Sequence, residues 1–131
     1  MSGVLSGAKL EKEMQYMLLI HGDESRMNPA AVVDDTGMSP EYHAYNTALV
    51  KAGVMLGGER LRPTSATTSV RVRDKKAVVL AGPYSETQEQ LGGYYLIDVP
   101  DLDQAIEWAK RCPAAQSGTI EVRPIWPTRP Q

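Results

Sequence analysis

Hydrophobic and polar residues recur along the chain with two different periods, and these periods predict its strands and helices. Residues 15–21 read QYMLLIH, a short apolar run that predicts a buried strand. Ser39 and Pro40 suit the cap and first turn of a helix. Apolar residues then follow at spacings of three and four until Gly53, so this segment is expected to be a helix that ends at the glycine.

The middle of the chain predicts a strand followed by a hairpin. Residues 54–61 begin apolar and contain a Gly-Gly pair at 57–58, which indicates a bulge or a close approach of another backbone. Apolar and polar side chains alternate over residues 67–73. A turn at 74–75 and a return strand at 77–80 complete the predicted hairpin.

The last third of the chain predicts a strand, a helix and a final strand. Residues 94–99 form the strand, and Asp101 with Gln104 three residues later has the spacing of a capping box. An apolar stripe at helical spacing follows and stops at Pro113. Residues 119–123 alternate again and predict the closing strand.

This order of elements predicts an α+β protein. Two helices lie between strands, which is typical of a ferredoxin-like βαββαβ sandwich, here with an inserted hairpin. Two helices can cover only one face of the sheet. We therefore expect a homodimer that packs through the other face.

A single domain is expected over residues 14–126. We interpret residues 1–13 as a flexible N-terminal extension and residues 127–131 as an irregular, proline-containing tail. Either Met1 or Met14 suits the start of the chain. Residues 22–38 show no regular period and predict a long loop, with a short helical turn near 29–33.

Charge and cysteine content narrow the classes of partner and site. The net charge is −2, so we expect no nucleic-acid partner. A single cysteine allows neither an intrachain disulfide nor a cysteine-based zinc site within one chain, and we expect no metal or other cofactor. No apolar run is long enough to span a membrane, and residues 1–13 lack the apolar core of a signal peptide, so a cytoplasmic location is expected.

One local cluster of cations stands out in the predicted hairpin. Its members are Arg71, Arg73, Lys75 and Lys76. We interpret them as the solvated face of the hairpin rather than as a phosphate-binding patch.

Five segments carry a resemblance to a known family. They are YMLLIHGDE (16–24), AGVMLGGERL (52–61), ATTSVRV (66–72), AGPYSETQEQLGGYYLIDVPDLDQAIEWAKRCPAA (81–115) and IEVRPI (120–125). Together they resemble the YCII-related family, in particular its DGPF-domain branch. The Asp-Gly-Pro-Phe motif of that branch reads AGPY (81–84) here, which keeps the Gly-Pro turn.

The resemblance implies a ferredoxin-like fold in a dimeric α/β-barrel arrangement, and it implies little about chemistry. Many such proteins are encoded near extracytoplasmic-function sigma factors, which implies an accessory or regulatory setting. The link to a sigma factor rests on this context alone. Some relatives in the wider family resemble enzymes with a His–Asp pair, among them a dehydrochlorinase of aromatic degradation.

Only half of that pair has a match in this sequence. His43 stands at the place of the family histidine, whereas Cys112 stands before Pro113 where the aspartate is expected. A catalytic base usually needs an orienting partner. We interpret Cys112 as a buried structural cysteine, because a helix C-terminus disfavours a thiolate.

Two histidines are candidates for a site. His43 is a candidate general base, and Asn46 shares its face of the predicted helix as a candidate ligand-binding residue. The alternative is a half-exposed surface histidine. His21 and Asp23 flank a glycine at the end of the first strand, and we interpret them as a strand end and turn, because two ligands are too few for a metal site.

Four charged residues are further candidates for ligand binding. Glu59 and Arg60 are neighbours on a strand, so their side chains point to opposite faces, and a structural ion pair is the alternative. Glu86 and Glu89, three residues apart, suit one face of a helical turn, as an acid–base pair or a cation site. The alternative is that their segment is a structured connection between elements.

Two functions remain open at this point. One is a small dimeric protein that binds a small organic molecule in an accessory or regulatory role. The other is a cofactor-free lyase of the dehydrochlorinase type with His43 as its general base. The cysteine at the place of the aspartate favours the first.

Overall fold

The computed structural model describes residues 14–26 and 38–128. The predicted N-terminal extension (1–13) and the helical turn near 29–33 lie outside these residues, as does the end of the tail. Residues 127–128 of the predicted tail belong to neither a helix nor a strand.

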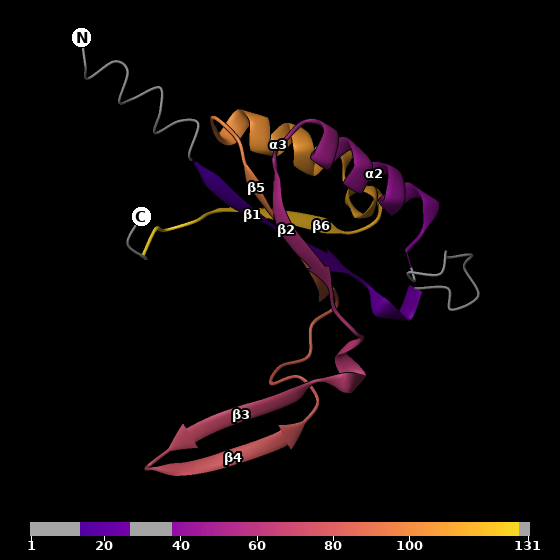
Figure 1. Ribbon diagram of the computed structural model, residues 1–131. Helices are drawn as coiled ribbons and strands as arrows, with labels where there is room; N and C mark the ends of the chain where they lie inside the picture. The colour runs from indigo at the N-terminus through magenta and orange to yellow at the C-terminus, as the bar shows by residue number, and fades with distance from the viewer. Residues whose placement is uncertain (1–13, 27–37, 129–131) are drawn as a thin grey trace.

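A four-stranded antiparallel sheet forms the centre of the structure (Figure 1). Its strands are β1 (Gln15–Gly22), β2 (Met55–Arg60), β5 (Gln90–Asp98) and β6 (Thr119–Pro124). They lie in the order β2-β5-β1-β6, with each neighbouring pair antiparallel. This order is compatible with a ferredoxin-like sandwich, and the α+β class is confirmed.

The two α-helices formed by the described residues lie on one side of this sheet (Figure 1). They are α2 (Pro40–Lys51) and α3 (Leu102–Arg111). Ser39 caps α2 by accepting from the backbone N–H of Tyr42, and Asp101 caps α3 by accepting from that of Gln104 at 2.9 Å. The caps predicted from the sequence are therefore confirmed. The described residues also form three short 3₁₀ helices: η1 (Glu24–Arg26), η2 (Thr64–Ala66) and η3 (Pro113–Gln116).

The core lies between the two helices and the sheet. Three aromatic rings meet there: Tyr45 of α2 packs edge-on against Tyr95 of β5, at a centroid distance of 5.3 Å, and against Trp108 of α3, at 6.2 Å. The Tyr45 hydroxyl donates to the Trp108 carbonyl at 2.7 Å. The phenol is therefore buried without losing its hydrogen bond.

Strand β5 starts four residues earlier than the 94–99 strand predicted from the sequence. Gly92 and Gly93 lie within it, and at Gly93 a neighbouring backbone comes very close. A Cβ on Gly93 would lie 2.8 Å from the Glu59 carbonyl oxygen, and one on Gly58 would lie 2.8 Å from both the Tyr94 carbonyl oxygen and Cδ1 of Tyr95. The close approach predicted for the Gly-Gly pair of β2 is confirmed, together with a bulge between Met55 and Gly57.

The predicted hairpin is confirmed and stands apart from the sheet and helices (Figure 1). It consists of β3 (Thr68–Arg73) and β4 (Lys76–Ala81). Asp74 and Lys75 join the strands, and both have positive φ, 51° and 65°. A two-residue loop of this kind matches the twist of paired strands.

The contact at Gly58 gives a stability prediction. We expect Gly58→Ala to lower the free energy of unfolding by about 1–3 kcal/mol, because the added methyl overlaps a backbone oxygen and the Tyr95 ring. Gly57→Ala is the matched control, since nothing lies within 4 Å of its Cβ position, and a change within about 0.5 kcal/mol is expected. Urea unfolding of both variants tests this. Equal effects would contradict the role of the contact.

Candidate functional site

The sheet face that the helices leave uncovered, called the open face below, has a partly buried apolar centre. Side chains alternate between the two faces of a strand. The core residues of β1 and β5 are buried against the helices, so the residues between them point to the open face. The apolar centre consists of Met17, Leu19, Tyr94 and Leu96, each of intermediate exposure.

A histidine–glutamate pair lies at one end of the open face. His21 on β1 is opposite Thr119 and Glu121 on β6 is opposite Leu19, so the two are diagonal neighbours on the same face. Nε2 of His21 lies 2.5 Å from Oε1 of Glu121. The His21 side chain is 23% exposed, and its other ring nitrogen has no hydrogen bond to a described residue. The carboxylate thus orients the ring, and Nδ1 has no partner among the described residues.

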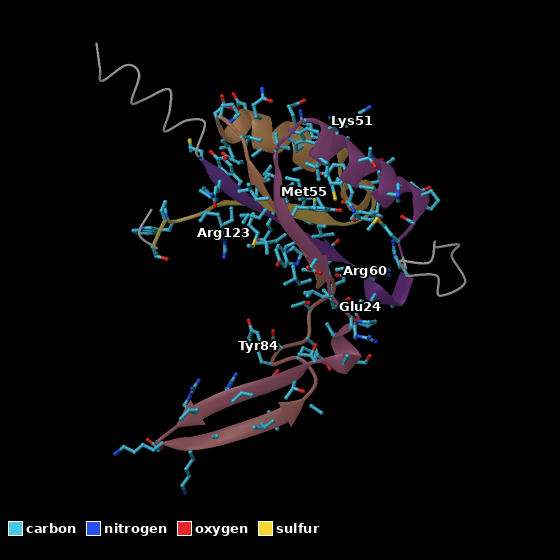
Figure 2. The ribbon with its side chains drawn as sticks, viewed as in Figure 1. Glu24, Lys51, Met55, Arg60, Tyr84 and Arg123 are labelled. Carbon is cyan, nitrogen blue, oxygen red and sulfur yellow. The ribbon has the colours of Figure 1, made fainter. Side chains whose placement is uncertain are left out.

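Arg123 brings a cation to the same face. It lies opposite Met17 and two residues after Glu121, so its side chain shares the open face with both. Figure 2 labels it near the end of β6, away from the helices. The open face thus presents an imidazole, a guanidinium and the carboxylates of Glu121 and Glu59 around an apolar centre.

This set of groups suits an organic anion. A guanidinium binds a carboxylate through charge-assisted hydrogen bonds, and an apolar centre accommodates the body of the molecule. An imidazole held by a carboxylate can donate or accept one further hydrogen bond, or a proton. The arrangement can therefore bind an organic acid and exchange a proton with it.

A polar hollow of about 260 Å³ lies just beyond the end of β1. Its lining residues are Asp23, Arg26, Gln88, Glu89 and Ser117. Asp23 accepts from the backbone N–H and the hydroxyl of Ser25, which lowers the pKa of its carboxyl, and Nε of Arg26 lies 3.7 Å away. Asp23 is thus held by its own turn and does not pair with His21.

The structure separates His43 from Asn46, which share a face in the sequence-based prediction. His43 is exposed on α2, and within the described part of the chain its side chain has no hydrogen bond or ion pair. Asn46 points inward, where its side-chain oxygen accepts from the Tyr95 hydroxyl and its amide nitrogen lies 3.2 Å from the Met38 sulfur. Asn46 therefore belongs to the helix–sheet packing.

The four charged candidates do not come together either. Glu59 is exposed on the open face opposite Tyr94, and Arg60 points to the other face. Glu86 is exposed in the connection before β5, whereas Glu89 lines the polar hollow.

A helical turn does not form at Glu86 and Glu89, because residues 83–89 contain bends and no helix. Side chains hold this connection in another shape. The Thr87 hydroxyl donates to the Glu89 carbonyl at 2.6 Å, and the Gln90 side chain donates to the Thr87 carbonyl. Such local hydrogen bonds compete with helix formation. The segment is a structured connection, as the alternative interpretation proposed.

The pairing of His21 with Glu121 is not apparent from local sequence. The two residues are 100 positions apart, and the nearest acid in the sequence, Asp23, is engaged elsewhere. The pair can be located once the pairing of β1 with β6 is known, because side chains alternate between the two faces along each strand. His21 and Leu19 point one way on β1, as Thr119 and Glu121 do on β6.

Comparison with known proteins places the chain among its relatives. The family model described as the YCII-related domain matches residues 14–129. This chain belongs to the YCII-related family. A protein of Rhizobium meliloti (strain 1021), described as uncharacterized, is 35% identical over 114 residues, which cover 86% of this chain and 92% of that protein.

In this YCII-related protein, position 112 faces the core. Cys112 is 1% exposed, and its sulfur lies 3.6 Å from the Tyr42 hydroxyl. Burial raises the pKa of the Cys112 thiol, which keeps it protonated. The interpretation of Cys112 as a buried structural cysteine is confirmed. A side chain at this position lies in the core, whereas His43 is exposed at the surface.

Two further findings concern metal ligands and membrane-spanning helices among the described residues. Within residues 14–26 and 38–128, no three side chains of His, Cys, Asp or Glu are grouped so that they could hold a metal ion. Neither α2 nor α3 combines the length and the apolar composition needed to cross a membrane.

Buried phenols and the thiol predict a loss of stability in alkali. Burial raises the pKa of Tyr95 to about 12 and also raises the pKa values of Tyr42, Tyr45 and Cys112. Each of these groups is protonated in the folded protein and ionises earlier in the unfolded chain. The stability that these groups give the folded protein is fully present below pH 9, which is near the pKa of the thiol in the unfolded chain. It is lost as the pH rises toward the pKa values of these groups in the folded protein.

We therefore expect the free energy of unfolding to fall above pH 9, by about 1.4 kcal/mol per pH unit for each group that titrates only in the unfolded chain. Urea unfolding at pH 8, 9, 10 and 11 measures the slope. Tyr95→Phe should flatten it between pH 10 and 11, whereas Tyr84→Phe, at an exposed position, should not. A slope that Tyr95→Phe leaves unchanged would contradict the assignment.

Proposed function

We propose that this protein is a homodimer that binds a small organic acid at the open face, in an accessory or regulatory role. The observation that carries the proposal is the His21–Glu121 pair beside the apolar centre, with Arg123 on the same face. Arg123 binds the carboxylate, the apolar centre contacts the body of the ligand, and Nδ1 of His21 forms the second polar contact.

The dimer through the sheet is part of this proposal. A sheet usually has both faces covered unless one is polar, and the open face has Met17, Leu19, Tyr94 and Leu96 at its centre. A second copy on this face encloses the ligand between two sheets, in a dimeric α/β-barrel arrangement. This is the arrangement implied by the resemblance to the DGPF-domain branch.

A cofactor-free lyase is the second candidate, and one specific observation favours it. A general base needs an orienting partner, and His21 has one in Glu121 at 2.5 Å. His43 is exposed and has no such partner among the described residues. In this version of the lyase hypothesis, the base is therefore His21 rather than His43.

Histidine ring signals in NMR test the proposal. The signals of His21 and His43 are assigned with His21→Ala and His43→Ala, and a panel of small aromatic and aliphatic carboxylates is then titrated into the protein. We expect at least one carboxylate to shift the His21 signals and to leave those of His43 in place. Arg123→Met should weaken that binding about tenfold or more, because it removes the charge-assisted contact.

Arg62→Met is the matched control, because Arg62 is an exposed arginine in the connection after β2. It should leave the affinity unchanged. A panel that shifts His43 alone, or neither histidine, would overturn the proposal. Ligand recovered unchanged after prolonged incubation supports binding without catalysis, and an elimination product supports the lyase.

A further inference from the structure

The β3–β4 hairpin, called the arm below, has one face composed almost entirely of apolar side chains. Its register places residues of the two strands side by side on each face. The apolar face consists of Thr68, Val70, Val72, Ala77, Val79 and Ala81, and the other face combines Leu80 and Val78 with Ser69, Arg71, Arg73 and Lys76. Every residue from Val70 to Ala81 is exposed.

The base of the arm is fixed to the rest of the protein. Thr64 donates to the Glu24 carboxylate through its backbone N–H, at 2.9 Å, and through its hydroxyl, at 2.9 Å. The Ser69 hydroxyl donates to the Gly82 carbonyl at 2.7 Å, where the arm returns. Figure 2 shows Glu24 and Tyr84 near this junction, with the arm extending beyond them. The arm is therefore held at its base while its apolar face remains uncovered.

An isolated two-stranded hairpin is at best marginally stable in water. A face with Val70, Val72 and Val79, which are 62%, 58% and 63% exposed, gains stability only when another surface covers it. The helix–sheet core of the same chain does not cover it, because the arm projects away from that core (Figure 1).

Charge indicates which surface fits. Four cations and Asp74 give the arm a net charge of +3. Because the whole chain carries −2, the remainder, called the body below, carries −5. Two arms packed on each other would repel, whereas an arm attracts the body of another copy.

We propose that the arm packs its apolar face on the body of a second copy of this chain. Two-fold symmetry then gives two equivalent contacts, one for each arm. The cations on the opposite face remain solvated and steer the arm toward the acidic body. This contact is separate from the sheet-to-sheet contact of the proposed function, and either can form without the other.

Two adjacent valines of β4 provide a matched test. Val79 lies on the apolar face and Val78 on the other face, and both are exposed. Val79→Asp and Val78→Asp change the charge of the arm equally, so they differ only in the face that they alter. Leu96→Asp changes the open face of the sheet. Sedimentation equilibrium of the full chain over a range of concentrations gives the dimer Kd of each variant, and circular dichroism checks that each is folded.

We expect Val79→Asp to raise the dimer Kd about tenfold or more and Val78→Asp to change it less than about twofold. A wild-type monomer, equal effects of both substitutions, or no effect of Val79→Asp would overturn the inference. If Leu96→Asp alone dissociates the dimer, the sheet-face dimer stands and the arm contact fails. If Val79→Asp alone dissociates the dimer, the arm contact stands and the sheet-face dimer fails.

The same variants distinguish a membrane from a second copy. Flotation with vesicles of mixed neutral and anionic lipids is the probe, because a basic hairpin with an apolar face also suits a membrane surface. Vesicle binding that Val79→Asp abolishes, together with a dimer that it leaves intact, would overturn the proposal in favour of a lipid surface.

Discussion

The orientation of Tyr95 fixes both faces of the sheet. Its ring lies against Tyr45 of α2 and over Gly58 of β2, where a methyl group has no room. Because alternate residues of a strand point in opposite directions, Tyr94 and Leu96 must then face away from the helices. The register of β5 therefore determines which residues form the helix–sheet core and which form the open face. A shift of β5 by a single residue would exchange them.

Much of the fold can be predicted from the sequence because its signals are local. Ser39 and Asp101 cap the helices that they were expected to cap, and Asp74 and Lys75 form the expected turn. The start of β5 was not predicted, since Gly92 and Gly93 usually indicate a break in a strand. Both lie within this strand, and the backbone of β2 passes close beside Gly93. A single sequence does not show which segments become neighbours.

The site was harder to predict for the same reason. The family pattern points to His43, and the helical spacing of Glu86 and Glu89 is one that the connection does not adopt. The sequence also contains His21, but its partner lies on a strand at the far end of the chain. Paired strands bring together residues that are remote in sequence, so only their register reveals such a pair.

The arm leaves and rejoins the sheet at almost the same point, where the backbone N–H of Leu61 donates to the carbonyl of Gly92 at 2.8 Å. The entropy of closing a loop grows only slowly with its length. The residues between Leu61 and the start of β5 can therefore be lengthened, shortened or replaced without moving β2 or β5. Relatives that share this sheet are free to diverge in the arm, so a change of assembly or partner does not require a new fold.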